Sequence, residues 1–251
     1  MNPQGPTIAL VQARMGSSRL PGKVLRPIAD RPMIHWVLTR ASRAHSLDRV
    51  VLATSDHPRD DALAAYVREL GYAVARGSEC DVLDRFVRAA QAHDAQVVVR
   101  ITADCPLIDP DIIDAVVDLR AREGADYASN TDPASFPDGL DVEVFTAAAL
   151  KRAADAATRP SDREHVTPFL RRDPFRRAAL RHDTDLSGLR WTVDQASDLA
   201  VVDRLARAMG RDDFTWQEAL AHWQAHSSAY TDNADIPRND GAVMRNGQKL
   251  W

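Results

Sequence analysis

Four short runs of β-branched and aliphatic residues recur in the first half of this chain, and each precedes a longer stretch with helical apolar spacing. The runs lie at 7–11, 49–53, 72–75 and 96–101, and the helical stretches lie at 32–44, 60–70, 82–92 and 110–122. Strands that alternate with helices pair in parallel, because each helix returns the chain to the starting edge of the sheet. The first half therefore predicts a doubly wound α/β fold.

The pattern changes after Asp126. The sequence then indicates strands at 139–145, 175–181 and 190–193, and helices at 146–157, 196–209 and 215–227. The first of these strands alternates polar and apolar residues, as a strand with an exposed face does. The tail 230–251 is polar and has no periodicity, so we expect it to be loose or to cover a neighbouring molecule. One domain with a mixed, mostly parallel central sheet is expected.

Charge and cysteine content exclude several classes of protein. The 251 residues carry 32 basic and 36 acidic side chains, a net charge of -4, so a general nucleic-acid binder is not expected and any positive field has to be local. Cys80 and Cys105 are too few for a zinc cluster or a disulfide framework, which favours a reducing, cytoplasmic setting. The sequence shows no signal-peptide pattern, and no apolar stretch approaches the ~20 residues of a membrane helix.

The segment 13–23 directly follows the first expected strand, at the sheet edge where open α/β folds bind ligands. It carries three cations, Arg14, Arg19 and Lys23, among the small residues Gly16, Ser17 and Ser18. Small residues let the backbone approach phosphate oxygens closely, and arginine presents forked donors to them. The segment therefore predicts a phosphate-binding loop, with a solvated basic loop as the alternative.

Two other phosphate-binding motifs fit this loop poorly. A Walker P-loop has four residues between its glycines and Ser or Thr after the lysine, whereas five residues separate Gly16 from Gly22 and Val24 follows Lys23. A dinucleotide-binding fingerprint has a second glycine two positions after the first, where this chain has Ser18. Neither motif is predicted here.

A series of motifs in fixed order over about 7–209 resembles the CMP-sugar synthetase superfamily. They are VQARMGSSRLPGKVL at 11–25 with RPMI at 31–34, ATSD at 53–56, RGS at 76–78, DVLDR at 81–85, RITADCPLID at 100–109, FPDGLDVEV at 136–144, REHVTP at 163–168 and LRWTVD at 189–194. The nearest resemblance is to SpsF-type cytidylyltransferases of spore coat polysaccharide biosynthesis, and CMP-Kdo and CMP-sialic acid synthetases are more distant. Ala103 stands where relatives often have glycine, and the neighbouring Asp104 is kept.

The resemblance implies a nucleotide-diphospho-sugar transferase fold, which is a Rossmann-like, three-layer α/β architecture. It also implies magnesium-dependent transfer of CMP from CTP to an acidic sugar, such as a nonulosonic acid, or to a related oxyanion, with release of pyrophosphate. One domain would span 1–229, with a nucleotide-binding half at about 7–125, acceptor and dimerisation elements at about 126–190, and the tail 230–251 outside it. The expected protein is a cytoplasmic homodimer without nucleic-acid or membrane partners.

The resemblance assigns catalysis to Arg14, Arg19, Lys23 and Asp104, and the metal to Asp104 and Asp194. Both aspartates follow expected strands, and magnesium is usually held by one or two carboxylates together with substrate phosphates. Each has a plainer interpretation, because Asp104 can stabilise a turn and Asp194 can cap the next helix.

Further residues are expected around the nucleotide and the acceptor. For the nucleotide they are Ala13, Arg14, Met15, Gly16, Ser17, Ser18, Arg19, Lys23, Ser55, Asp56, Arg76, Asp81, Thr102 and Ala103, with backbone groups at 9–13 and 101–103 available to the base. For the acceptor they are Asp138, Asp141, Glu143, Glu164 and His165. The alternatives are a surface ion pair for Arg76, a solvated edge-strand face at 138–143, and the capped first turn of a helix at 163–165.

Three other functions stay open at this point. The acceptor could be a sugar phosphate or phosphonate, which is already ionised. A glycosyltransferase of the same broad fold would use an Asp-x-Asp metal motif, and Asp109-Pro-Asp111 has these letters, although capping of the following helix explains them. A nucleotide-binding subunit without catalysis is the third possibility, and no general base is assigned.

Overall fold

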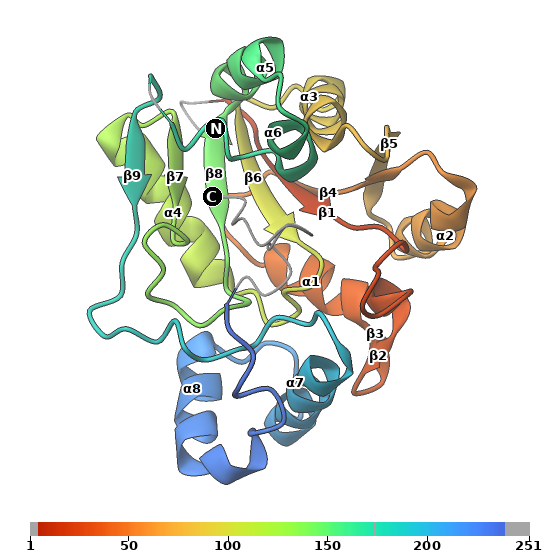
Figure 1. The fold of residues 1–251 in the computed structure, drawn as a ribbon, viewed down its shortest axis with the longest axis vertical. Helices are drawn as coiled ribbons and strands as arrows, with labels where there is room; N and C mark the ends of the chain where they lie inside the picture. The colour runs from red at the N-terminus through yellow and green to blue at the C-terminus, as the bar shows by residue number, and fades with distance from the viewer. Residues whose placement is uncertain (1–4, 173, 239–251) are drawn as a thin grey trace.

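The computed structural model describes residues 5–172 and 174–238. Its sheet consists of β1 (Thr7–Gln12), β4 (Arg49–Ser55), β5 (Ala73–Gly77), β6 (Val97–Thr102), β7 (Tyr127–Ser129), β8 (Glu143–Thr146) and β9 (Arg177–Ala179). The strand order is β5-β4-β1-β6-β8-β7-β9, and β8 alone among these seven runs antiparallel to its neighbours (Figure 1). This mixed, mostly parallel sheet confirms the predicted fold class.

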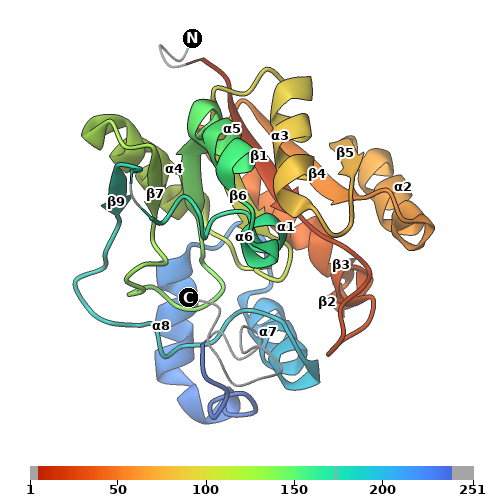
Figure 2. The same cartoon turned by 45° about the horizontal axis from the view of Figure 1, so that its top comes forward.

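Helices cover both faces of the sheet. They are α1 (Met33–Ala41), α2 (Asp61–Glu69), α3 (Val82–Ala92), α4 (Pro110–Glu123), α5 (Ala147–Ala156), α6 (Pro160–His165), α7 (Ala196–Met209) and α8 (Trp216–Ala225), with short 3-10 turns at Lys23–Leu25, Pro58–Asp60 and Ser227–Ala229. Figure 2 shows α3, α5 and α6 on one face, with α1 and α4 on the other. The helices α7 and α8 lie together beyond one end of the sheet (Figure 1).

The alternation of side chains along β1 explains why both faces need cover. Ile8 and Leu10 belong to the apolar cluster that contains α3 and α5, whereas Ala9 and Val11 belong to the cluster on the opposite side. All four are buried, because successive residues of a strand point to opposite faces and this strand lies between two helical layers. A continuous apolar run is therefore the expected pattern for β1.

Polar residues define where the helices begin. Asp109 caps α4 by accepting a hydrogen bond from the amide of Asp111 at 3.0 Å, and it also accepts one from the amide of Trp216 at 2.8 Å. This confirms the interpretation of Asp109-Pro-Asp111 as a helix start. Because Asp109 is 1% exposed and both its oxygens are engaged, it is not available as part of an Asp-x-Asp metal motif.

The second half corrects several predictions. The strand expected at an exposed edge over 139–145 is β8, which begins at Glu143 and pairs with β6 and β7 inside the sheet. Polar and apolar residues do alternate along this segment. However, Val144 and Phe145 pack into apolar clusters on opposite faces of the sheet, so neither face is solvated. The strand expected at 190–193 is wrong, because Arg190 forms an isolated bridge with Asp138 instead.

Other elements were not predicted or were placed differently. The short strand β7 and the hairpin of β2 (Pro27–Ile28) with β3 (Arg31–Pro32) carry too few residues for a periodic signal. Residues 163–165 end α6 rather than begin a helix.

The described part of the tail also differs from the expectation. Tyr230 is buried and stacks on Trp223 with ring centroids 4.5 Å apart, so residues 230–238 pack on the chain itself. The rest of the predicted tail, 239–251, lies outside the described residues. Among the helices that the structure describes, none is both long enough and apolar enough to cross a membrane.

Candidate functional site

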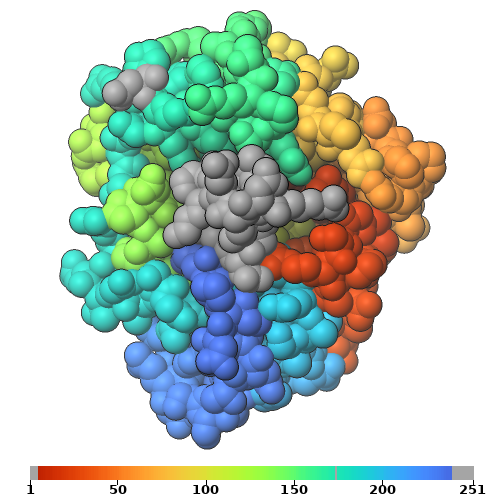
Figure 3. All heavy atoms as spheres, viewed as in Figure 1, coloured from red at the N-terminus to blue at the C-terminus, as the bar shows by residue number. Residues whose placement is uncertain are grey.

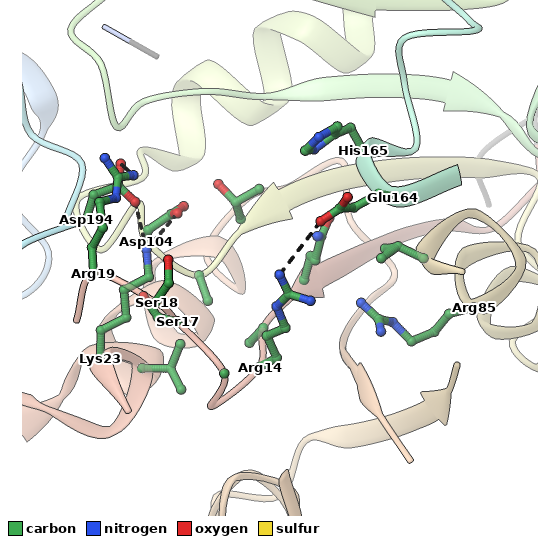
Figure 4. Close-up of a pocket in the computed structure, with 17 residues that line it drawn as sticks. Arg14, Ser17, Ser18, Arg19, Lys23, Arg85, Asp104, Glu164, His165 and Asp194 are labelled. Atoms are coloured by element: carbon green, nitrogen blue, oxygen red, sulfur yellow. Dashed lines mark hydrogen bonds and ion pairs between the residues drawn. The ribbon is translucent and has the colours of Figure 1, made fainter. Parts of the chain in front are cut away.

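A cavity of about 340 Å³ opens where β1 and β6 end, and the loop 13–23 forms one of its walls (Figure 4). Its lining includes most of the residues predicted for the nucleotide, namely Ala13, Arg14, Gly16, Ser17, Ser18, Arg19, Lys23, Thr102 and Ala103. Asp104, Asp194, Glu164 and His165 also line it. The position agrees with the rule that open α/β sheets bind ligands at the carboxyl ends of their strands.

A buried carboxylate holds the loop in place. Asp60 accepts a hydrogen bond from the amide of Met15 at 2.8 Å, and the same side chain accepts from the hydroxyl of Thr54 and from the amide and hydroxyl of Ser55. Burial raises the pKa of Asp60, but these donors together bring it below the ordinary value, so the carboxylate stays ionised. Because Asp60 is fully buried, it fixes the loop to the end of β4.

Lys23 joins the two aspartates that the resemblance assigns to a metal. Its Nζ lies 3.0 Å from Oδ2 of Asp104 and 3.0 Å from Oδ1 of Asp194, and it donates to the carbonyl of Val193 at 2.9 Å (Figure 4). Burial lowers the pKa of Lys23, but the two carboxylates outweigh it and raise the pKa above its ordinary value. Burial likewise raises the pKa of Asp104, and Lys23 brings it down to about 2. Lys23 and Asp104 are therefore both charged at neutral pH.

Two arginines hold the other oxygen of Asp194. Arg19 lies 2.9 Å and Arg190 3.2 Å from its Oδ2, and Arg190 in turn pairs with Asp198 at 2.8 Å. The expectation that Asp194 could cap α7 is wrong, because Gln195 and Asp198 form the capping box of that helix. The side chain of Asp194 is thus left to face the cavity.

The acid pair fits a divalent cation by its chemistry. Asp104 and Asp194 present hard carboxylate oxygens that converge on one cationic nitrogen, and magnesium is commonly held by two carboxylates and substrate phosphates. Within the described residues there is no group of three or more acidic, histidine or cysteine side chains arranged to hold a metal. A metal at Asp104 and Asp194 would therefore need further oxygen ligands from a substrate.

A second cavity of about 520 Å³ adjoins the first and shares part of its lining. The shared residues are Arg14, Ser18, Arg19, Thr102, Asp104, Glu164, His165 and Asp194. All five residues predicted for the acceptor line the second cavity. Two ligands bound in the two cavities would meet beside Asp104.

Six carboxylates and six guanidinium groups line the second cavity. They are Asp104, Asp138, Asp141, Glu143, Glu164 and Asp194, with Arg14, Arg19, Arg100, Arg171, Arg190 and Arg238. Such a lining offers acidic and basic side chains in equal number. It can recognise a polar, charged ligand because the ligand can replace existing pairs rather than leave charges buried alone.

Glu143 is the most enclosed of these acids, and its place corrects the expectation of a solvated strand face. It is 3% exposed, pairs with Arg100 and with Arg171 at 2.7 Å, and accepts a hydrogen bond from the hydroxyl of Tyr127 at 2.6 Å. Burial raises the pKa of Glu143, but Arg171 and Arg100 lower it to about 2. Glu143 thus orients two arginines at the cavity wall.

Asp138 and Asp141 also line the second cavity. Asp138 lies 3.1 Å from Arg190, and Asp141 pairs with Arg238. Burial, followed by the nearby charge of Asp141, raises the pKa of Asp138 to about 7. This carboxyl group can therefore exist in either protonation state near neutral pH.

Glu164 and His165 lie at the end of α6 and line both cavities; Figure 4 shows them on the side of Arg14. Glu164 is 3.9 Å from a guanidinium nitrogen of Arg14, which also approaches Glu79 at 4.0 Å. Burial is the main cause that lowers the pKa of His165, and nearby arginines lower it further. The charge of Glu164 acts in the opposite direction but does not outweigh them. The imidazole is therefore neutral at pH 7.

Five residues predicted for the nucleotide do not line the first cavity, namely Met15, Ser55, Asp56, Arg76 and Asp81. Met15 and Ser55 instead contact Asp60. Arg76 forms an ion pair with the exposed Asp61 at 2.6 Å, which agrees with the alternative of a surface ion pair.

Asp81 caps α3 and pairs with Arg163 at 2.6 Å. The amides of Ala13 and Ala103 donate to the carbonyls of Ala53 and Gln12, so they are already used within the fold and are not available to a base.

Several arginines of the site were missed. Arg85 is 1% exposed and lines the first cavity. Its Nη1 donates to the carbonyl of Ser78 at 2.8 Å, whereas its buried Nε has no hydrogen-bond partner among the residues that the structure describes. Arg100 interrupts an apolar strand, a signal that could have been used. Arg171 and Arg238 give no comparable local signal, because their role depends on distant partners.

Comparison with known proteins agrees with this geometry. The sequence profile of the cytidylyltransferase family matches residues 8–197. The chain is 34% identical to the spore coat polysaccharide biosynthesis protein SpsF of Bacillus subtilis (strain 168), over 89% of this chain and 96% of that protein. A 3-deoxy-manno-octulosonate cytidylyltransferase of Anaeromyxobacter sp. (strain K) is 40% identical over 43% of this chain and 44% of its own length.

A solved structure shares the fold over most of its length. It is a cytidylyltransferase from Leptospira borgpetersenii serovar Hardjo-bovis (strain JB197), with a TM-score of 0.86, 29% identity, and coverage of 89% of this chain and 96% of that one. The resemblance drawn from the sequence motifs is confirmed by these matches. This chain therefore belongs to the cytidylyltransferase family.

Proposed function

We propose that this protein transfers CMP from CTP to an acidic sugar and releases pyrophosphate. The observation that carries the proposal is the contact of Lys23 with both Asp104 and Asp194 at the junction of two cavities. The first cavity has the cations that a triphosphate needs, and the second has a lining rich in arginine. The family of the chain supports CTP as the donor.

The triphosphate binds along the loop 13–23. Arg14 and Arg19 offer forked donors to phosphate oxygens, and the small residues Gly16, Ser17 and Ser18 allow close approach of the backbone. Lys23 is anchored by two carboxylates, so its positive charge is already in place when pyrophosphate departs. Such preorganised charge lowers the barrier to reaction.

Asp104 and Asp194 would hold the magnesium ion, which supplies charge neutralisation to the phosphates when it is bound. Their convergence on one cation supports this assignment. Arg19 and Arg190 keep Asp194 oriented toward that point, since both contact its second oxygen.

The reaction is an in-line displacement at the α-phosphorus of CTP. A hydroxyl oxygen of the acceptor forms a bond to the α-phosphorus, the bond from that phosphorus to the bridging α,β-oxygen breaks, and pyrophosphate takes the electron pair. The acceptor proton passes to the neutral imidazole of His165, directly or through water. The place of His165 in the lining of both cavities supports this role.

The lining of the second cavity supports an acidic acceptor. Arginines at its walls favour a carboxylated sugar, and the substrate in the name of the Anaeromyxobacter relative is a sugar acid. Sugar phosphates and phosphonates are anions too, so they belong in the same test.

The test is to measure pyrophosphate release from CTP and Mg²⁺ with a panel of 3-deoxy-manno-octulosonate, a nonulosonic acid, sugar phosphates and phosphonates. We expect pyrophosphate release with at least one acid of this panel, with CTP preferred over ATP, GTP and UTP. Release of a nucleoside diphosphate from an activated sugar would favour a glycosyltransferase instead. Binding of CTP without turnover of any acceptor would indicate a nucleotide-binding subunit.

A further inference from the structure

The C-terminal segment, residues 230–238, follows α8 in the chain and reaches the second cavity at Arg238. Residues 230–238 follow the last 3-10 turn, and in Figure 3 the dark blue end of the described chain runs from the region of α7 and α8 toward the middle of this face. The segment lies beyond residue 197, where the match to the family profile ends. The profile therefore does not account for the contacts of this segment with the cavity.

Two buried residues fix the path of this segment. Tyr230 stacks on Trp223 with an angle of 14° between the rings. Asn233 is 2% exposed, and its amide nitrogen donates to the carbonyl of Arg190 at 3.1 Å and to Oδ1 of Asp198 at 3.0 Å. A buried side-chain amide with two such partners is held in a single orientation, so the residues after it are delivered to a defined place.

That place is the wall of the second cavity that carries Asp138 and Asp141. The guanidinium of Arg238 pairs with Asp141 and donates to the carbonyl of Phe136 at 3.2 Å. Its side chain is 16% exposed, and it lines the cavity. Arg238 is thus the cation that faces the Asp138 and Asp141 wall from the C-terminal side.

Arg238 differs from Arg190 in how far its guanidinium is already engaged by carboxylates. Arg100 and Arg171 share the one carboxylate of Glu143, and Arg190 is paired with three aspartates. Arg238 has one ion-pair partner among the described residues. A guanidinium has five donors, so Arg238 can contact a ligand anion while it keeps Asp141.

We propose that Arg238 determines specificity for acidic acceptors, as the cationic group that the C-terminal segment supplies to the acceptor cavity. This inference rests on the proposed cytidylyl transfer. Arg238 is the ion-pair partner of Asp141, so its loss removes one positive charge from the lining of the acceptor cavity and disfavours an anion there. The binding of an uncharged acceptor would be weakened much less by the loss of Arg238.

The test compares Arg238→Gln and Arg238→Lys with wild type in the full chain. The acceptor is the acid of the panel that wild type uses, together with its methyl ester or amide as the neutral analogue. We expect Arg238→Gln to raise KM for the acid about tenfold or more, which is the scale of one charge-assisted hydrogen bond. KM for CTP should change less than about twofold, and the preference for the acid over its neutral analogue should shrink. Arg238→Lys should recover part of that preference.

Arg211→Gln is the matched control, because Arg211 is also ion-paired, with Asp213 and Glu218, but is not among the residues that line either cavity. It should leave both KM values unchanged. A merely structural role for Arg238 would change the melting temperature and both KM values together, without altering the preference for the acid.

Failure of this inference can be told apart from failure of the proposed function. An active wild type whose acid KM and acid preference are unaffected by Arg238→Gln overturns the role of Arg238. Wild type that releases no pyrophosphate from CTP with any acceptor overturns the proposed function, and this inference with it.

Discussion

The two adjoining cavities are built in different ways. The smaller one takes most of its cations from the single loop 13–23, which Asp60 ties to the end of β4. The larger one collects its charged side chains from segments between Arg14 and Arg238, and most of its arginines are balanced by nearby carboxylates. A short loop thus gives one cavity its charge, whereas the whole fold assembles the other.

This difference separates two kinds of substitution. Substitutions in the smaller cavity should change nucleotide binding and the rate of the chemical step, because Lys23 and Asp104 would act on the phosphates. Changes in the larger cavity should affect stability or acceptor choice, because its charges are arranged in pairs.

The largest effect is expected at Asp104, where the two cavities meet. Asp104→Asn should lower kcat by more than about 10³-fold, because it removes a charge that would hold the metal and that pairs with Lys23. Pyrophosphate release measures turnover, and circular dichroism should show an intact fold. Asp118→Asn, an exposed position on α4, serves as the control. Normal turnover of Asp104→Asn would remove Asp104 from the mechanism.

A large effect on stability is expected within the larger cavity. Glu143→Gln should lower the free energy of unfolding by roughly 3 kcal/mol, because it leaves Arg100 and Arg171 without their shared carboxylate. Urea denaturation at pH 7 measures this. An unchanged midpoint would show that the two arginines find other partners.

The same residue predicts a pH dependence. The pKa of Glu143 in the folded protein, about 2, lies below its ordinary value, so its contribution to stability is present above about pH 4.5 and is lost as the pH falls toward 2. Glu143→Gln should therefore lose less stability than wild type over that range.

Replacement of Lys23 tests the smaller cavity. Lys23→Met should lower kcat by about 10²-fold, the scale of one charge-stabilising group, with little change in KM for the acceptor. Stopped assays of pyrophosphate measure both quantities. Lys151→Met, which removes an exposed lysine paired with Asp155, is the matched control. A larger change in acceptor KM than in kcat would contradict the division between the cavities.

The smallest effect is expected at Arg85. Arg85 lines the first cavity, so its guanidinium can contact a CTP oxygen, and Arg85→Gln should raise KM for CTP about tenfold. KM for the acceptor should stay within about twofold. Comparison with Arg88→Gln, an exposed arginine of the same helix, isolates the effect. Equal changes at both positions would exclude a nucleotide contact by Arg85.

The contrast between the cavities also explains what the sequence could predict. The parallel strands and the loop 13–23 were found because their signals are local, namely apolar runs and a cluster of cations beside small residues. Convergence of Asp104 and Asp194 followed from the resemblance, and the structure adds Lys23 between them.

Other parts depend on partners far away in the chain. The inward place of Glu143 depends on Arg100 and Arg171, and alternation alone cannot distinguish a solvated face from a buried polar one. Arg238 lies in a polar tail, and its place depends on Asn233, which binds Arg190 and Asp198.

The most direct measurement is a crystal structure of the protein with CTP and Mg²⁺. We expect the triphosphate along the loop 13–23, with Arg14, Arg19 and Lys23 on its oxygens and with Asp104 and Asp194 at the metal. A nucleotide bound elsewhere, or a triphosphate that faces away from these five side chains, would contradict the proposed function.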